Sequence, residues 1–433
     1  MELTVVGCGY VGLVTAACFA DLGNRVIGVD VDAVRVQALK KGRIPIYEPG
    51  LEEIVRRNIK DGRLTFQTSL ADAVRASRII FIAVGTPPAA DGDVDLTAVR
   101  MVAAEIGKSL NGDKIIVNKS TVPVGMADAV GDMAQKSARG KKHKVRVVSN
   151  PEFLREGTAV TDFMHPDRVV VGSSDKRAAE AVADLYRPLD AHVIVTDVRS
   201  AEMIKYASNA FLATKISFIN EIASLCEKLG ADVAAVANGM GKDKRIGREF
   251  LYAGVGFGGS CLPKDVAALR RAVEKAGLTP RLLAAVLEVN ESQRRSVVEK
   301  LSDGLGKLAG KTVAVLGLAF KPSTDDLREA VSQTVLPQLI RAGAKVRAYD
   351  PAANEGSKRN HPQAVYCKSA LDAAKGAHAA VVLTEWNEFV ELDLVKLRGV
   401  MAGQKPVLVD GRNVYDPDKA KAAGFTYRGV GRG

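Results

Sequence analysis

Short β-branched segments alternate with segments of helical periodicity, and this alternation constrains the fold more than any other feature of the sequence. A helical run at 11–22 separates the first two strand-like runs, and strand-like runs are found at residues 3–6, 25–30, 79–84, 114–117 and 145–148. Apolar strands separated by helices predict a parallel sheet that is covered on both faces. We expect this α/β region to occupy about residues 1–200.

The sequence changes character after residue 200. Residues 200–230 and 263–304 have helical periodicity, with no strand-like run between them, and the alternation resumes at 311–316, 345–350, 379–383 and 406–410. A chain of 433 residues has room for two or three domains at ~100–200 residues each. We therefore predict an α/β fold with two doubly wound Rossmann-like domains, at 1–200 and 306–433, joined by a central helical segment at 201–305.

The glycines Gly7, Gly9 and Gly12 form the pattern G-x-G-x-x-G between the first predicted strand and the first predicted helix. Asp30 ends the next predicted strand. In this context the glycines let the main chain approach a pyrophosphate, and the carboxylate binds the adenosine ribose hydroxyls. A carboxylate here repels a 2′-phosphate, so the pattern favours NAD over NADP; a tight turn without a ligand is the alternative.

The two ends of the chain resemble a weak internal repeat. Residues 4–7 are similar to residues 312–315, and Asp30 corresponds to Asp350. The second copy continues as Gly-Leu-Ala-Phe-Lys at 317–321 and lacks the further glycines. We expect only the first copy to hold a dinucleotide.

A glycine-rich segment at 256–265 ends with Cys261, Pro263 and Asp265. Proline suits the first position of a helix, which places Cys261 just outside a helix N-terminus, where a thiolate is stabilised. Asp265, one turn later, is placed to project back toward the thiol. An inert buried cysteine is the alternative.

Two pairs of polar residues have helical spacing. Lys205 and Asn209 share one face of a predicted helix, although an exposed lysine is the ordinary interpretation. Glu152 and Glu156 lie one turn apart in a predicted short helix over 150–157, begun by proline and closed by glycine. They suit proton transfer, but a helix cap and a solvated acid explain them almost as well.

Composition limits the class of partner. The formal charge is +11, the densest basic run, 139–144, has the character of a solvated loop, and 5% aromatic residues are too few for a base-stacking surface. The uncharged run 3–20 contains glycines and lacks basic residues before it, and no other apolar run approaches ~20 residues. We expect an anionic small-molecule partner, with no nucleic acid, membrane or metal.

The cysteines are few and scattered along the chain: Cys8, Cys18, Cys226, Cys261 and Cys367. We therefore expect a reducing, cytoplasmic compartment and no structural disulfide.

Taken in order along the chain, these motifs resemble the UDP-glucose/GDP-mannose dehydrogenase family. The resemblance spans nearly the whole chain and rests on the glycine pattern, 48–51, 85–87, 119–125, 150–157, Lys205 with Asn209, the Cys261 segment, and 320–328. Residues 245–247 and 410–412 are similar to the members that use UDP-sugars, whereas Leu262 after the cysteine is also seen in relatives that use GDP-mannose.

The resemblance implies a four-electron oxidation of UDP-glucose to UDP-glucuronate by two NAD, through a thiohemiacetal and a thioester on Cys261. Lys205 would stabilise the oxyanion with help from Asn209. Asp265 and Thr121 would position a water molecule, and Glu152 or Glu156 would transfer protons. At least a homodimer is implied, with the central helices in contact and Arg245 reaching the substrate of a neighbouring subunit.

The resemblance also assigns binding residues. The cofactor residues implied are Gly7, Gly9, Tyr10, Val11, Gly12, Asp30, Arg35, Gly85, Thr86, Thr121, Glu156, Lys264 and Arg328. The substrate residues implied are Phe153, Leu154, Lys205, Asn209, Arg245, Phe250, Tyr252, Phe257, Gly258, Phe320, Lys321 and Arg412.

Three other functions stay open at this point. The substrate could be GDP-mannose or a UDP-N-acetylhexosamine. The reaction could be a two-electron oxidation in which Cys261 is idle. The chain could also be a non-enzymatic nucleotide or nucleic-acid binder that uses its positive charge, for which tight, salt-dependent binding to a duplex is expected.

Overall fold

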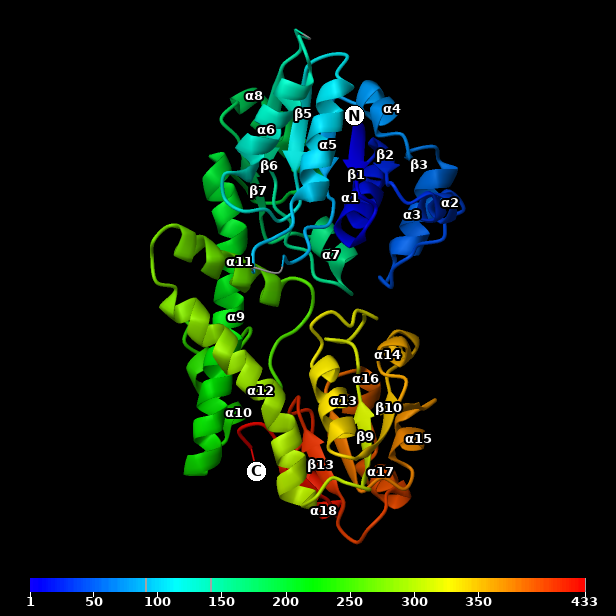
Figure 1. Ribbon diagram of the computed structural model, residues 1–433, viewed down its shortest axis with the longest axis vertical. Coiled ribbons are helices and arrows are strands. Elements are labelled where there is room, and N and C mark those ends of the chain that lie inside the picture. The colour runs from blue at the N-terminus through cyan, green and yellow to red at the C-terminus, as the bar shows by residue number, and fades with distance from the viewer. Residues whose placement is uncertain (90–91, 141, 433) are drawn as a thin grey trace. The chain divides into compact units, whose positions relative to one another are not determined.

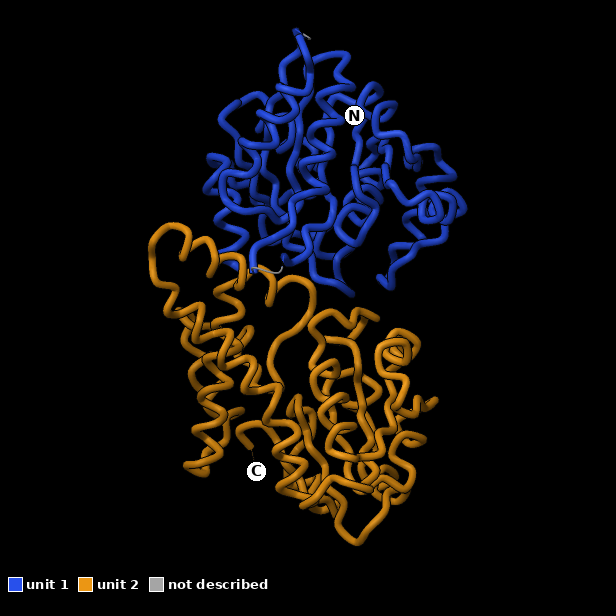
Figure 2. The backbone as a smooth tube through the Cα atoms, in the orientation of Figure 1, with its two compact units in different colours: residues 1–208 blue, residues 209–433 orange. Residues whose placement is uncertain are grey.

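The computed structural model describes residues 1–89, 92–140 and 142–432. The chain divides into two compact units, residues 1–208 and 209–433 (Figure 2). The division falls inside one long helix, α9 (Val198–Leu229). The expected domain boundaries near 200 and 305 stay a prediction.

The first unit contains a sheet with the strand order β3-β2-β1-β4-β5-β6-β7-β8. Neighbouring strands pair in parallel except β6 and β7, which are antiparallel. The strands are β1 (Glu2–Val6), β2 (Arg25–Val29), β3 (Leu64–Gln67), β4 (Ile79–Ile82), β5 (Lys114–Asn118), β6 (Val145–Ser149), β7 (Val169–Gly172) and β8 (Val193–Thr196). The predicted parallel α/β region is confirmed.

Helices cover both faces of this sheet (Figure 1). One apolar core lies under α1, α2, α3, α7 and α8, and a second lies under α4, α5 and α6. The helices are α1 (Tyr10–Asp21), α2 (Ala33–Lys40), α3 (Leu51–Lys60), α4 (Leu70–Ala76), α5 (Thr97–Lys108), α6 (Met126–Ser137), α7 (Ala159–Met164), α8 (Lys176–Ala183) and the 3₁₀ helix η1 (Asp184–Leu189). The basic run lies between α6 and β6, and its Lys141 lies outside the described residues.

The second unit begins with helices and ends with another parallel sheet. After α9 come α10 (Val233–Gly241), α11 (Leu262–Lys275) and α12 (Arg281–Leu305), as the sequence pattern predicts for the central segment. The sheet has the order β11-β10-β9-β12-β13-β14, and all its neighbours pair in parallel. The strands are β9 (Thr312–Leu316), β10 (Lys345–Tyr349), β11 (Val365–Tyr366), β12 (Ala379–Val382), β13 (Val407–Asp410) and β14 (Thr426–Arg428).

Two apolar cores again lie on opposite faces of the second sheet, one with α12 and α13 and one with α15 to α18. The helices are α13 (Ser332–Arg341), α14 (Asn354–Asn360), α15 (Ala370–Ala374), α16 (Asn387–Val390), α17 (Leu394–Val400) and α18 (Pro417–Ala422). The orders β3-β2-β1-β4-β5 and β11-β10-β9-β12-β13 correspond, so the internal repeat is a repeat of topology.

One local prediction is wrong. Residues 150–155 form no helix, and a turn at 156–158 leads into α7. Side chains, not helical carbonyls, hold this segment: the Leu154 amide donates to the Glu152 carboxylate, and the Gly157 amide donates to Tyr10 and Glu48. These alternative acceptors explain why the i, i+4 spacing of the glutamates does not produce a helix.

The five cysteines are free thiols, and all but Cys261 are buried. Within the described part of the chain, no helix combines the length and the apolar character that crossing a membrane requires.

Candidate functional site

The glycine pattern forms a tight turn between β1 and α1. Gly7 has φ of +95°, and a Cβ there would lie 2.7 Å from the Ala83 carbonyl oxygen. A Cβ on Gly12 would lie 1.8 Å from the Gly7 carbonyl oxygen, whereas one on Gly9 would meet nothing within 4 Å. The backbone is thus closely packed on its inner side and open at Gly9, at the N-terminus of α1, which fits a pyrophosphate.

Asp30 lies at the carboxyl end of β2, beside this turn. Its carboxylate accepts hydrogen bonds from the amides of Cys8 (2.8 Å) and Asp32 (3.0 Å) and from Arg35 (3.0 Å). Burial raises the pKa of Asp30, but these hydrogen bonds and the charge of Arg35 bring it below its usual value. The group is therefore an ionised acceptor, as a ribose hydroxyl requires.

Thr86 and Thr121 follow the neighbouring strands β4 and β5, and the Thr86 hydroxyl donates to the Thr121 carbonyl over 3.0 Å. Gly85 precedes Thr86, and a Cβ there would meet nothing within 4 Å. The carboxyl ends of neighbouring parallel strands are where ligands bind in open α/β sheets. The structure therefore gathers the glycine turn, Asp30 and these two threonines at one edge.

Glu202, which the sequence interpretation missed, fixes the segment after Thr121. Its carboxylate accepts the amides of Gly125 (2.6 Å) and Ala127 (2.8 Å) at the N-terminus of α6. Burial raises the pKa of Glu202 to about 7, although these hydrogen bonds oppose the rise. The segment that carries Thr121 is thus attached to α9.

Lys205 and Glu152 form a buried ion pair. Lys205 Nζ donates to Glu152 Oε1 over 2.9 Å and to the Glu152 carbonyl oxygen over 2.7 Å. Lys205 is 4% exposed, so the interpretation as a surface lysine is wrong. Burial raises the pKa of Glu152, but Lys205 and the Leu154 amide lower it below its usual value.

The two glutamates of the 150–157 segment differ in burial. Glu152 is 6% exposed, whereas Glu156 is only partly buried in the turn before α7. Between them, Phe153 lies under two cations, with Lys205 Nζ 5.3 Å and Arg168 Cζ 3.7 Å from the ring centroid. The two carboxyl groups are thus in different environments.

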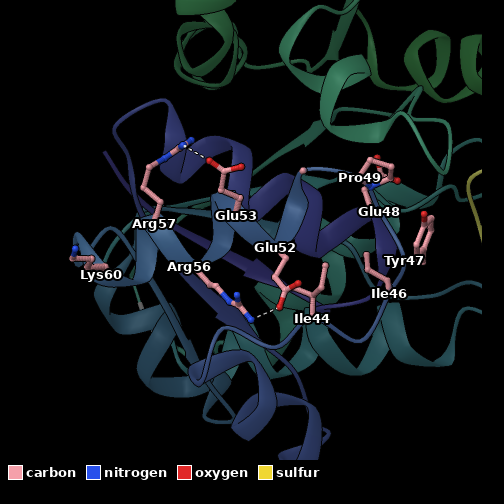
Figure 3. A pocket seen from close by; sticks show the side chains of 11 residues that line it. Ile44, Ile46, Tyr47, Glu48, Pro49, Glu52, Glu53, Arg56, Arg57 and Lys60 are labelled. Carbon is pink, nitrogen blue, oxygen red and sulfur yellow. Dashed lines mark hydrogen bonds and ion pairs between the residues drawn. The ribbon is translucent and has the colours of Figure 1, made fainter.

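Glu48 and Tyr10 hold the end of this segment. The Gly157 amide donates to the Tyr10 hydroxyl and to Glu48 Oε2, each over 2.7 Å. Glu48 also lines a surface pocket of about 810 Å³ beside α3 (Figure 3). The two arginines that line this pocket, Arg56 and Arg57, pair with Glu52 and Glu53, so its charges are largely matched within the pocket.

In the second unit, Cys261 is the N-cap residue of α11, with proline in the first turn, as predicted. The Asp265 amide donates to the Cys261 carbonyl oxygen over 2.8 Å. The buried Asp265 carboxylate accepts Asn209 Nδ2 and Lys264 Nζ, each over 2.6 Å. Asp265, Lys264 and Asn209 therefore form one polar cluster at the first turn of α11, and the partly exposed Cys261 thiol lies 3.5 Å from the Ser260 hydroxyl.

Two side chains of α12, which the sequence interpretation also missed, hold the glycine-rich segment before the cysteine. Asn290 bonds both the amide (2.8 Å) and the carbonyl (3.1 Å) of Phe257, and Arg294 donates to the carbonyls of Phe257 and Glu329, each over 3.0 Å. A Cβ on Gly258 would lie 2.1 Å from the Glu329 carbonyl oxygen. Glycine is required there because two loops meet at their main chains.

Arg412 joins the loops around this segment. It donates to the carbonyls of Leu383 (2.8 Å), Gly256 (3.3 Å) and Phe320 (3.3 Å). Lys321 Nζ lies 5.6 Å from the Phe320 ring centroid. The structure thus brings the predicted substrate residues Phe257, Gly258, Phe320, Lys321 and Arg412 together.

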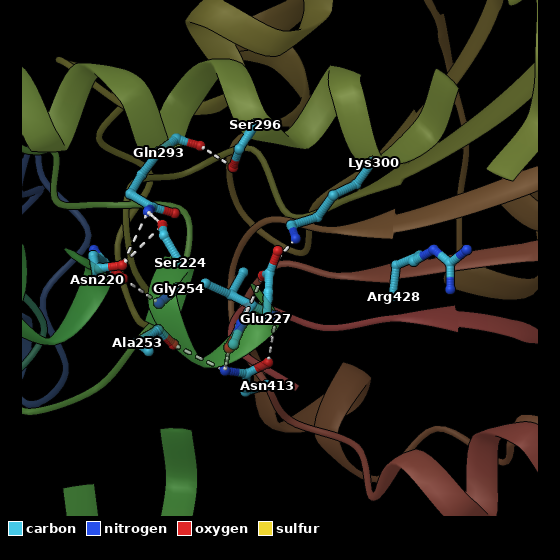
Figure 4. A network of polar contacts seen from close by, with 12 residues as sticks. Asn220, Ser224, Glu227, Ala253, Gly254, Gln293, Ser296, Lys300, Asn413 and Arg428 are labelled. Carbon is cyan, nitrogen blue, oxygen red and sulfur yellow. Dashed lines mark hydrogen bonds and ion pairs between the residues drawn. The ribbon is translucent and has the colours of Figure 1, made fainter. Parts of the chain in front are cut away.

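The preceding segment is held by amide side chains (Figure 4). The Gly254 amide donates to Asn220 Oδ1 over 2.8 Å, and Asn413 Nδ2 donates to the carbonyls of Ala253 (3.3 Å) and Val430 (2.8 Å). The segment that leads to Cys261 is therefore attached to α9 and to the end of the chain.

Other predicted residues are less enclosed. Tyr252 is 53% exposed and packs against Arg248. Arg245 pairs with Asp243 and is 89% exposed, and Arg328 pairs with Asp326 and is 63% exposed. Phe250 has φ of 65°, a conformation that non-glycine residues rarely adopt.

Comparison with known proteins accounts for all three parts of the chain. Family models for the NAD binding, central and UDP binding domains of UDP-glucose/GDP-mannose dehydrogenases match residues 1–190, 199–292 and 314–417. The chain belongs to the UDP-glucose/GDP-mannose dehydrogenase family. The first unit accordingly carries the NAD binding domain of a family of NAD-dependent oxidoreductases, in agreement with the glycine turn and Asp30.

Members of this family resemble the chain over its full length. UDP-glucose 6-dehydrogenase TuaD of Bacillus subtilis is 50% identical and covers 100% of this chain and 93% of its own length. UDP-glucose 6-dehydrogenase of Pseudomonas aeruginosa is also 50% identical, with 100% and 98% covered. The structure of a UDP-glucose dehydrogenase from Pyrobaculum islandicum matches with a TM-score of 0.94 at 43% identity, covering 100% of this chain and 98% of that chain.

Proposed function

We propose that this chain oxidises the 6-hydroxymethyl group of UDP-glucose to a carboxylate, consuming two NAD per sugar and yielding UDP-glucuronate. Full-length relatives of that name at 50% identity support the substrate. The observation that carries the covalent route is Cys261 at the N-cap of α11, with a buried Asp265 bonded to Asn209 and Lys264.

In the first oxidation, the hydroxyl group loses a proton and the carbon becomes an aldehyde. When bound, NAD would accept the hydride that leaves this carbon, and a second NAD would accept the hydride lost in the second oxidation. Lys205 and Asn209 stabilise the substrate oxygen as its negative charge develops. The burial of both side chains supports this role, because a hydrogen bond to an oxyanion is stronger away from water.

In the second oxidation, the Cys261 sulfur bonds to the aldehyde carbon and forms a thiohemiacetal, whose oxidation gives a thioester. Water then adds to the thioester carbonyl, the carbon–sulfur bond breaks, and the carboxylate and the thiol are released. Thr121 and Asp265 position this water molecule. Glu152 takes the proton of this water molecule. We assign this role to Glu152 because it is the buried partner of Lys205. Glu156 is assigned to the cofactor.

The binding residues are proposed in two sets. The glycine turn, Tyr10, Val11, Asp30, Arg35, Gly85, Thr86, Thr121, Glu156, Lys264 and Arg328 contact NAD. Phe153, Leu154, Phe250, Tyr252, Phe257, Gly258, Phe320, Lys321 and Arg412 contact the UDP-sugar, with the cations meeting the diphosphate.

Electron counting tests the reaction. The purified chain, incubated with excess NAD and a limiting amount of UDP-glucose, is expected to form two NADH per sugar and an acidic product. One NADH per sugar with a carbonyl product would reject the double oxidation. Activity with GDP-mannose or a UDP-N-acetylhexosamine, but not with UDP-glucose, would reassign the substrate.

We also propose a cytoplasmic homodimer that forms through the central helices. Phe211, Phe218 and Leu225 recur every seven residues on α9 and are 65%, 47% and 52% exposed. This spacing places them on one face of the helix, and large apolar side chains exposed in a row mark an interaction surface. In this dimer Arg245 reaches the substrate of the partner subunit.

The dimer is tested by replacing Phe218 with Glu. Light scattering is expected to show a monomer for Phe218→Glu and a dimer for Met101→Glu, an exposed position on α5 that serves as control. Equal masses for the two variants would contradict this interface.

A further inference from the structure

Lys119 is a buried cation to which the proposed reaction assigns no role. It is 4% exposed, and the two members of the buried ion pair, Glu152 and Lys205, are 6% and 4% exposed. Lys119 follows β5 and Glu152 lies shortly after β6, the neighbouring parallel strand, with Asn118 opposite Ser149. All three groups thus belong to the ligand-binding edge of the first sheet.

The partners of Lys119 cannot neutralise its charge. Lys119 Nζ donates to Asn150 Oδ1 and to the Tyr186 hydroxyl, each over 3.2 Å, and lies 5.8 Å from the Tyr186 ring centroid. The Tyr186 hydroxyl itself donates to Asn150 Oδ1 over 2.6 Å. Burial raises the pKa of Tyr186, so the phenol stays protonated. These contacts give the ammonium group of Lys119 hydrogen-bond acceptors, but neither acceptor carries a negative charge.

Glu152 is already paired. Lys205 occupies one carboxylate oxygen, and the Leu154 amide occupies the other over 2.7 Å. Glu152 and Lys205 together carry no net charge, so a further positive charge nearby makes the buried group of Lys119, Glu152 and Lys205 a net cation. Retaining an unpaired buried charge is unfavourable for folding, which points to a use in function.

The three groups affect one another electrostatically. Burial lowers the pKa of Lys119 to about 8, Glu152 opposes this change, and Lys205 adds to it. Lys119 in turn helps to lower the pKa of Glu152. The charged or titratable groups facing Lys119 are therefore Glu152, Lys205 from α9 and Tyr186 from η1.

We propose that Lys119 is a positioning residue whose ammonium group offsets the negative charge of Glu152 and so leaves the charge of Lys205 available to the substrate oxygen. This inference rests on the proposed function. Without Lys119, Glu152 would cancel the charge of Lys205, and an alkoxide on the sugar would be stabilised less. Lys119 acts through its two neighbours and contacts no reacting atom.

The pH profile of turnover tests this role. Wild-type kcat with saturating UDP-glucose and NAD is expected to fall above about pH 8, where Lys119 loses its proton. Lys119→Met is expected to have kcat about tenfold lower than the wild type at neutral pH. Its kcat should not fall further above about pH 8, because the variant has no lysine there to lose a proton. Lys119→Arg retains its charge, so its plateau is expected to extend above that of the wild type. A fall near pH 8 in all three proteins would overturn the proposal.

Stability gives a readout that does not depend on turnover. Because the pKa of Lys119 is lower in the folded than in the unfolded chain, the unfolded chain binds more protons above about pH 8. The free energy of unfolding of the wild type should therefore rise, relative to Lys119→Met and Lys119→Arg, from about pH 8 toward the ordinary lysine pKa of 10.5. If the difference in free energy of unfolding between the wild type and the variants stays constant over this range, Lys119 is not a buried cation with a lowered pKa.

The two readouts also separate this proposal from the function. If the wild type does not oxidise UDP-glucose, the proposed function fails, and the unfolding experiment alone reports on the buried cation. If the wild type forms two NADH per sugar and Lys119→Met keeps the wild-type pH profile, only the role of Lys119 fails.

Discussion

The two Rossmann-like sheets begin with the same turn, and the turns have different surroundings. Gly7 and Gly317 have φ of +95° and +94°, and each is packed so closely that a Cβ would lie 2.7 Å from Ala83 or 2.5 Å from Thr384. Asp30 and Asp350 follow the neighbouring strands β2 and β10 and accept main-chain amides from their turns. The framework is therefore duplicated down to a glycine and a carboxylate.

The difference lies in the residues after each turn. In the first sheet α1 begins at Tyr10 and Gly9 is open, whereas in the second sheet residues 317–331 precede α13. Asp350 accepts five hydrogen bonds, from the amides of Leu318, Ala319, Ala352 and Ala353 and from the Trp386 indole N–H, whereas Asp30 accepts three. The Asp350 carboxylate therefore stabilises the loop that follows its own turn. The same strand and turn can thus have two uses. Where the helix begins directly after the turn, as α1 does, the turn is open to a ligand, and where a long loop precedes the helix, as before α13, the turn holds that loop.

The largest effect is expected from Gly12→Ala. The added methyl group would lie 1.8 Å from the Gly7 carbonyl oxygen, so α1 must move away from the turn. We expect a loss of about 1–3 kcal/mol or more in the free energy of unfolding, together with loss of NAD binding. Chemical denaturation and calorimetric titration with NAD measure the two quantities.

Gly9→Ala is the matched control for that variant. Its methyl group enters open space, so the stability is expected to change little while NAD affinity falls. If both variants keep wild-type NAD affinity, the first turn is not a dinucleotide site and the comparison fails.

An intermediate effect is expected from removing each carboxylate. Asp350→Ala leaves the buried amides of Leu318 and Ala319 and the partly buried Trp386 indole N–H without their acceptor, at about 1–3 kcal/mol for each buried group that stays unsatisfied. Asp30→Ala is expected to be less destabilising but to weaken NAD binding about tenfold or more, because a charged hydrogen bond to the cofactor is lost. If Asp30→Ala and Asp350→Ala lose equal stability and Asp30→Ala keeps the NAD affinity of the wild type, the two sheets do not differ in function as described.

The smallest effect concerns pH. Because the pKa of Asp30 lies below 3.8 in the folded protein, the carboxylate stays ionised from about pH 5 to about pH 8 and protonates only in stronger acid. The ratio of NAD affinities of the wild type and Asp30→Asn is therefore expected to be constant across this range. A ratio that changes between about pH 5 and about pH 7 would show that Asp30 titrates there, contrary to its hydrogen bonding.

Patterns with strong local causes were predictable from the sequence. The glycine turn, the parallel sheet implied by alternation, and Cys261 at a helix N-terminus each depend on residues that are close in sequence. The family resemblance added the residues that have no local signal. Lys205 is an example, since its spacing alone allowed a surface position and only the fold buries it.

Contacts between distant segments were not predictable in this way. The 150–157 segment is irregular because Tyr10, Glu48 and Lys205, far away in sequence, satisfy its polar groups. The roles of Asn290 and Arg294 result from the packing of α12 against the cysteine segment. A single sequence contains no periodic signal for such contacts.

Turnover by Cys261→Ser tests the central claim most directly. The variant is expected to bind NAD and UDP-glucose like the wild type, and to show no steady formation of UDP-glucuronate, because no thioester can form. Wild-type turnover with two NADH per sugar in Cys261→Ser would contradict a covalent role for this cysteine.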